Sequence, residues 1–154
     1  MIPDFLQEFP NLHPLIVHFP IVLLLLAALT QFAVLFFQKS NQLKWLSFLF
    51  MVLATIGAFI AYHTGVHISG DASNEAIEIF EKHKLLGTIT LWTSLLASLL
   101  RFSTLKWFSK KWVEIILFTL FISVAILVSV TAHHGAQMVY IYGIGPQGNG
   151  VMLE

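Results

Sequence analysis

Cysteine and charged residues are what the sequence has least of. The chain has 154 residues and no cysteine, and only 10% of its residues are charged. The missing thiols exclude disulfides, thiolate metal sites, cysteine-bound iron–sulfur clusters and covalently attached c-type haem. A soluble domain carries about 25% charged residues, so these few charges cannot cover a surface in contact with water. The bilayer is therefore the expected solvent, and the zero net charge argues against nucleic acid as a partner.

Hydrophobic residues make up 57% of the chain and gather in four long runs. Each run is long enough, at about 1.5 Å per residue, to cross a hydrocarbon core of about 30 Å. The sequence predicts an all-α fold, a single integral membrane domain over residues 1–154 in which four transmembrane helices form a bundle. The first run is expected to stay in the mature protein, because its leader is acidic where a signal peptide needs positive charge. The predicted spans are residues 14–38, 43–62, 84–102 and 111–133.

A short amphipathic helix is predicted before the third span. Residues 71–82 open with helix-capping residues and contain no proline, and no glycine interrupts them. Ala76, Phe80, His83 and Gly87 recur at intervals of four, three and four residues, which places them on one helix face. The aromatic, glycine-rich tail that follows the fourth span is expected to lie back along the membrane surface.

Charge placement predicts the orientation of the bundle. Both termini and the middle connection share one side of the membrane, side one, and the two short connections share the other, side two. Side two carries six basic residues and one acidic residue, a net charge of +5, whereas side one carries two basic and seven acidic residues, a net charge of −5. Basic residues in short loops mark the cytoplasmic side. Both termini are therefore predicted to be periplasmic, in the inner membrane of a bacterium.

All seven histidines fall on side one of this topology. Imidazole at a membrane boundary binds a metal or haem, handles protons, or is simply solvated. A cluster that takes one or more residues from every helix favours a shared role. His13 and His18 begin the first span, His63 and His67 follow the second, His83 begins the third, and His133 and His134 end the fourth.

His18 is the most informative member of this set. It lies in an otherwise apolar segment, where an unpaired polar ring costs free energy, so we expect a partner for it. Pro20 removes a backbone hydrogen bond and predicts a kink that would open the bundle near the histidines. His13, His67 and His134 also fit ordinary interfacial positions, because water is available there.

Three stretches of the sequence resemble a known family, in order and over nearly the whole chain. They are LHPLIVHFPIVLLLL near the amino terminus, GDASNEAIEIFEKHKLLG before the third span, and AHHGAQMVYIYGIG after the fourth. They are similar to the bacterial four-helix membrane domain of unknown function 2231, whose members look like electron-transfer components because some are fused to Rieske or cytochrome c modules. The resemblance carries over His13, His18, His83 and His133. The chain departs from the family at Gln137, where many relatives have a histidine.

The residues predict a b-type haem held by two neutral imidazoles from different helices in the periplasmic half of the bundle. His18 and His83 lie at equal depth, and Gly87 supplies space for the porphyrin edge. His133 and then His13 are the next candidate ligands. With both axial positions filled, the protein would be a redox component rather than an enzyme. Its expected redox partner is a periplasmic cytochrome c or Rieske-type protein, or quinol.

Two other classes of function stay open. The histidines and the carboxylates of Asp71 and Glu75 could hold a copper, zinc or iron ion, because imidazole suits all three metals. Alternatively, the chain is a cofactor-free structural subunit of a homo-oligomer or of a larger respiratory or transport complex. The candidate metal ligands are His18, His83, His133 and His63, followed by His67 and His134.

Overall fold

Four long helices make up the described part of the chain. The structure, a computed structural model, describes residues 13–65, 67–69, 72–106 and 110–144, and these residues contain no strand. All four helices are long and apolar enough to cross a membrane, which confirms the predicted all-α membrane bundle. The helices are α2 (His13–Phe36), α3 (Asn41–His63), α4 (Asn74–Lys106) and α5 (Lys111–Tyr140).

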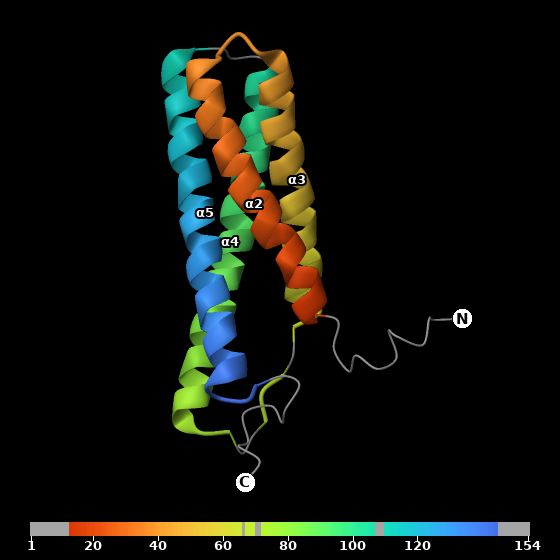
Figure 1. The fold of residues 1–154 in the computed structure, drawn as a ribbon, viewed down its shortest axis with the longest axis vertical. Helices are drawn as coiled ribbons and strands as arrows, with labels where there is room; N and C mark the ends of the chain where they lie inside the picture. Colours follow the sequence, from red (N-terminus) through yellow and green to blue (C-terminus); the bar gives the residue numbers. More distant parts are fainter. Residues whose placement is uncertain (1–12, 66, 70–71, 107–109, 145–154) are drawn as a thin grey trace, which may run out of the picture.

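The helices pack as an antiparallel bundle (Figure 1). Helix α2 packs against α3 and α5, and α4 packs against the same two helices, so α2 and α4 lie on one diagonal. Small residues such as Ala27, Ala54 and Ala97 lie in the core and let the helices approach closely. The larger core side chains include Leu24, Met51, Leu117 and Phe121.

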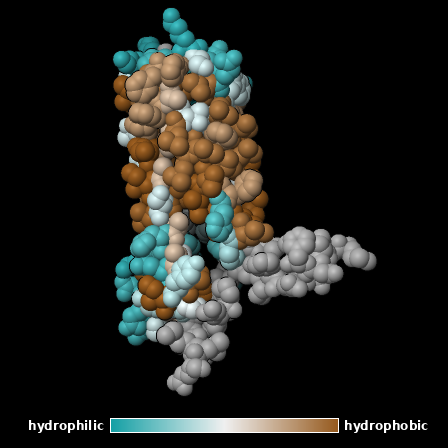
Figure 2. All heavy atoms as spheres, in the orientation of Figure 1, coloured by the Kyte–Doolittle hydropathy of each residue, from teal (hydrophilic) through white to brown (hydrophobic). Residues whose placement is uncertain are grey.

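Large apolar side chains cover the outside of the bundle. Figure 2 shows a hydrophobic belt on the face in view, with hydrophilic residues toward both ends of the bundle. Phe19 is 70% exposed and Trp92 is 63% exposed. A continuous apolar surface of this extent is unstable in water and is typical of a protein in contact with lipid.

Helices α4 and α5 extend beyond α2 and α3 at one end, the lower end in Figure 1. The predicted amphipathic helix and the third span form one continuous helix of 33 residues. The hydroxyl of Ser73 caps this helix by accepting a hydrogen bond from the Ala76 amide at 3.2 Å. This end is side one of the predicted topology, because it holds the first residue of α2 and the last residue of α3.

The first residues of the tail expected to lie back along the membrane surface instead continue the fourth helix. Helix α5 continues to Tyr140, because packing of its last two turns against α4 outweighs the low helix propensity of Gly135. The chain then reverses at Gly143, whose φ of +60° suits a glycine. The Ile144 amide donates to the Met138 carbonyl at 2.9 Å, and Ile144 is buried against α4 and α5. The rest of the tail, residues 145–154, lies outside the described residues.

The expected opening at Pro20 is replaced by a close contact between helices. Pro20 is buried, and a Cβ atom built on Gly57 of α3 would lie only 3.2 Å from its Cδ atom. The absence of a side chain at Gly57 therefore lets α2 and α3 meet at the proline ring, in the half of α2 that begins at His13.

This contact predicts a position-dependent effect of a larger side chain. Gly57→Leu should force α2 and α3 apart and lower the free energy of unfolding by about 1–3 kcal/mol, the usual cost of overpacking. The measurement is the thermal unfolding midpoint in detergent, followed by circular dichroism. Gly65→Leu is the control, because Gly65 is exposed and a Cβ atom there makes only an ordinary contact, at 3.7 Å. Equal midpoints for the two variants would contradict the assigned contact.

Candidate functional site

The histidines lie toward the end of the bundle where α2 begins and α3 ends. His13 is the first residue of α2 and His63 is the last residue of α3. His83 lies on α4 beyond its first two turns, and His133 and His134 lie near the end of α5. Every helix therefore brings at least one imidazole to this end.

His83 is the most firmly held of these imidazoles. Its ring is half-buried, and its Nδ1 atom lies 2.9 Å from the Thr131 carbonyl oxygen on α5. A carbonyl only accepts hydrogen bonds, so Nδ1 carries the proton and Nε2 keeps its lone pair. Gly135 packs against the same ring, since a Cβ atom there would lie 3.1 Å from His83 Cε1. The ring is thus fixed in position and in tautomer by two residues of α5.

His13 is the second half-buried imidazole at this end. Its Nδ1 lies 3.3 Å from the Thr64 hydroxyl, which itself donates to the Ala61 carbonyl at 3.2 Å. The hydroxyl proton is engaged, so the His13 Nδ1–H donates to Thr64. The His13 and His83 rings lie close enough for an electrostatic interaction, and so do those of His83 and His134. Imidazoles from α2, α4 and α5 are therefore near one another.

The other predicted site residues lie at the periphery. His18 is exposed on α2, and its Nδ1 bonds the Pro14 carbonyl of its own helix at 2.5 Å. Its expected partner is thus backbone of the same helix rather than a group in the bundle interior. His133 is exposed, and its ring meets the edge of the His134 ring, with 5.9 Å between the ring centroids. His67 is exposed in the connection between α3 and α4.

Donors for a bare metal ion are not gathered in the described part of the chain. Among those residues no three His, Asp or Glu side chains are placed to share an ion. Glu75 is exposed on the first turn of α4, and Asp71 lies outside the described residues. Gly87 faces α5, where a Cβ atom would meet Thr131 Cγ2 at 3.8 Å, so this position leaves the space of about one methyl group.

A second polar site, which the sequence reading missed, lies at the opposite end of the bundle. The Glu114 carboxylate of α5 is buried; one of its oxygens lies 2.8 Å from Arg101 Nη1, and the other lies 3.3 Å from Lys44 Nζ. The Gln31 amide donates to the same carboxylate at 3.1 Å and accepts from the Ser47 hydroxyl at 2.9 Å. We call these five residues the ion cluster; all four helices contribute to it.

Arg101 is the centre of the remaining contacts in the ion cluster. Its side chain is fully buried, and its Nε donates to the Lys44 carbonyl at 3.3 Å. The Nη2 atom has no hydrogen-bond partner among the described residues. Buried charges in a membrane protein are expensive unless they are paired, so this cluster ties the four helices together at one end.

Hydroxyl side chains form a buried row on α4 between the two sites. Thr90, Ser94 and Ser98 recur every four residues and are all buried. Thr90 is hydrogen-bonded to Thr131 of α5 at 3.3 Å, and Ser98 to Thr55 of α3 at 3.1 Å. Small hydroxyl residues let transmembrane helices pack closely and bond across the contact, so this row joins α4 to both of its neighbours.

Two features of the sequence indicate the ion cluster, although a count of charges per loop does not reveal them. Glu114 is the single acidic residue among six basic residues on side two, which points to a specific partner. Gln31 interrupts a long apolar run, as does His18 at the other end of the same helix. A polar side chain in such a run requires a hydrogen-bond partner, and the buried Gln31 finds its partner in the ion cluster.

Four membrane-length helices, a lipid-facing apolar belt and a paired ion cluster define a polytopic four-helix membrane protein. The chain belongs to the family described as predicted membrane protein (DUF2231), whose model matches residues 10–148. The resemblance of the three sequence stretches to this family is thereby confirmed. No curated protein and no solved structure matches the chain.

The ion cluster predicts a large loss of stability when its acid is removed. Glu114→Gln would leave two buried cations without a counter-charge, and the expected destabilisation is about 3–5 kcal/mol. The measurement is the unfolding midpoint in detergent. Glu78→Gln is the matched control, because it breaks an exposed Lys82–Glu78 pair on α4 and should leave the midpoint unchanged. A Glu114→Gln midpoint equal to that of the wild type would show that the cluster does not hold the helices together.

Proposed function

We propose that the protein is a membrane-bound electron-transfer protein that binds haem b through imidazoles at the histidine-rich end of the bundle. The observation that carries the proposal is that two half-buried imidazoles, His83 and His13, lie at the same end of the bundle and interact electrostatically. These half-buried imidazoles from diagonally opposed helices lie within electrostatic range of each other, and the tautomer of His83 leaves Nε2 available. Their placement favours His13, rather than His18, as the second ligand.

The donor set supports a haem better than a bare metal ion. A bare copper, zinc or iron ion takes three or four protein donors, and the described residues gather no such group. A haem iron needs only two axial imidazoles. When bound, the haem would supply a reversible one-electron change, and two imidazole ligands would leave no open position for a substrate.

The residues around His83 have clear roles in this proposal. The Thr131 carbonyl accepts the hydrogen bond from His83 Nδ1–H, which leaves the lone pair of Nε2 as the one that can bind iron. Most metal-binding histidines show this arrangement. Gly135 holds the ring from the side, and Gly87 leaves a narrow space between α4 and α5. Thr64 holds the His13 ring at the start of α2.

Absorption spectra of purified variants test this function. The wild-type protein should show a Soret band that sharpens on reduction with dithionite, and a protohaem pyridine adduct. His83→Ala and His13→Ala should each abolish these signals. His67→Ala is the matched control and should keep them, as should His18→Ala, since His18 bonds its own helix.

Three results would count against the assignment. A colourless wild-type protein from haem-replete cells would overturn the haem. A normal spectrum in both His83→Ala and His13→Ala would overturn the ligand pair. Loss of the spectrum in His18→Ala with retention in His13→Ala would restore His18 and His83, the ligand pair predicted from their equal depth.

The proposed location is the inner membrane of a bacterium, with the histidine-rich end in the periplasm. Four lysines at the opposite end, in or beside the two short connections, are exposed, whereas both lysines of side one are paired with glutamates. Positive charge in short connections marks the cytoplasmic side. On the periplasmic side the protein would exchange electrons with a cytochrome c or Rieske-type protein. The exposed lysines are Lys39, Lys106, Lys110 and Lys111.

Reporter fusions test this orientation. Alkaline phosphatase fused after Glu154 should be active, because the enzyme folds only in the oxidising periplasm. The same reporter inserted after Lys39, in the first short connection, should be inactive. The reverse pattern would place the histidine-rich end in the cytoplasm.

A further inference from the structure

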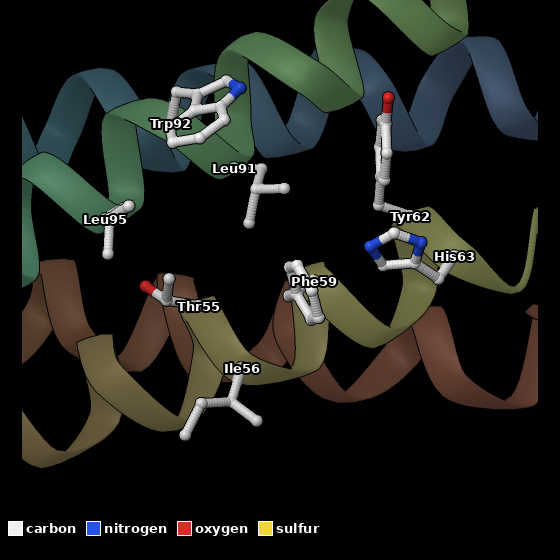
Figure 3. Close-up of a pocket in the computed structure, with 8 residues that line it drawn as sticks. All are labelled: Thr55, Ile56, Phe59, Tyr62, His63, Leu91, Trp92 and Leu95. Carbon is white, nitrogen blue, oxygen red and sulfur yellow. The ribbon is translucent and has the colours of Figure 1, made fainter.

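A groove lies between α3 and α4 (Figure 3). Its volume is about 430 Å³, within the range of small-molecule sites, which is about 300–1,000 Å³. Helix α3 lines it from Thr55 to His63, a length of about 12 Å, and α4 lines it with Leu91, Trp92 and Leu95. Thr55, one of its lining residues, is hydrogen-bonded to Ser98 of α4 at 3.1 Å.

The groove opens to the hydrocarbon rather than to water. Three aromatic side chains form much of its lining, and each is about half exposed or more: Phe59 at 54%, Tyr62 at 48% and Trp92 at 63%. These residues lie within membrane-length helices. A ligand must therefore come from the bilayer and present an apolar, flat surface to these rings.

His63 supplies a polar group at one end of the groove. Figure 3 shows a ring nitrogen of His63 turned toward the groove. The ring makes edge contacts with Phe59 at 4.5 Å and with Tyr62 at 5.3 Å. No hydrogen bond to either His63 nitrogen is made by the described residues. The imidazole is therefore ready to bond an oxygen atom of a ligand, at the level where α3 ends.

Charge complementarity distinguishes the lipids that this groove suits. Among the described residues, no Lys, Arg, Asp or Glu side chain lines it, so it offers nothing to the charged phosphate of a phospholipid headgroup. An acyl chain has no group for the imidazole to bond. A lipid with a neutral, planar, oxygen-bearing ring and an apolar tail fits all three features. Its ring packs on the aromatic walls, its oxygen bonds the imidazole, and its tail leaves through the opening into the hydrocarbon.

We propose that the groove between α3 and α4 binds the ring of an isoprenoid quinone or quinol, with a ring oxygen hydrogen-bonded to His63. The aromatic side chains pack on the ring, and the tail leaves into the hydrocarbon past Thr55 and Leu95. This quinone or quinol would be the lipid-soluble redox partner of the protein, a role that rests on the proposed electron-transfer function. The binding itself is measured on haem-free protein, so the two can fail separately.

Photolabelling tests the site. Haem-free protein in phosphatidylcholine nanodiscs is labelled with an azidoquinone bearing a decyl tail, and the labelled peptides are identified by mass spectrometry. Label is expected on residues 55–63 and 91–95, and decylubiquinone should compete for it. Decylbenzene, which has the tail and a ring without oxygens, should not compete. Label spread evenly over the lipid-facing residues, or equal competition by decylbenzene, would make the groove an ordinary acyl-chain contact and overturn the proposal.

Matched variants separate the imidazole from the shape of the groove. His63→Phe keeps a ring but loses the hydrogen bond, so decylubiquinone should compete about five- to tenfold more weakly; His133→Phe, at another exposed histidine, should have no effect. Leu95→Trp fills the groove and should abolish labelling. Leu99→Trp, one turn further along α4 at a residue that is 57% exposed, should retain it. Unchanged competition in His63→Phe, or full labelling in Leu95→Trp, would refute the assigned site. An absent haem spectrum with intact labelling would refute only the electron-transfer function.

Discussion

The bundle depends on the ion pairs and the hydrogen bond that the buried Glu114 carboxylate makes. The carboxylate bonds side chains from each of the three other helices, Gln31 on α2, Lys44 on α3 and Arg101 on α4. A bundle with charged groups in its interior is stable only where every charge has its partner, because an unpaired charge in a low-dielectric interior costs much free energy. A sliding or rotation of any helix would break part of this set, so the cluster fixes the register of all four helices at one end.

The other end of the bundle, where we propose that haem binds, is built in a different way. Helices α2 and α3 stop near His13 and His63, whereas α4 and α5 continue and pack against each other. The histidines lie where the four-helix part gives way to this pair of helices. The side chains there meet through single hydrogen bonds and ring contacts rather than through buried ion pairs. Buried ion pairs therefore hold one end of the bundle, and weaker contacts made by polar side chains hold the histidine-rich end.

Much of the fold could be predicted from the sequence, but less of the site. Hydrophobic run length alone gave four helices, because crossing a bilayer demands a nearly fixed number of apolar residues. Depth along a helix placed the histidines at one end but could not tell that the His18 ring faces outward, since that depends on the rotation of α2. Counting Lys44, Arg101 and Glu114 as loop charges hid their mutual pairing. Pairs between distant helices follow from tertiary packing, which a single sequence does not encode as a local pattern.

The contact of Ile144 with α4 has a consequence for how the protein is completed in the cell. The first turns of α4 bury Ala76 with Met138 of α5 and with Ile144, which follows α5 in the sequence. Chains emerge from the ribosome in sequence order, so these turns wait without a core while α4 and then α5 enter the membrane. The imidazole of His83 gains its support from Thr131 and Gly135 at the same late stage. Within the four-helix bundle, the histidine-rich end is therefore the last part to form, and a chain truncated before α5 would insert its earlier helices without ever forming it.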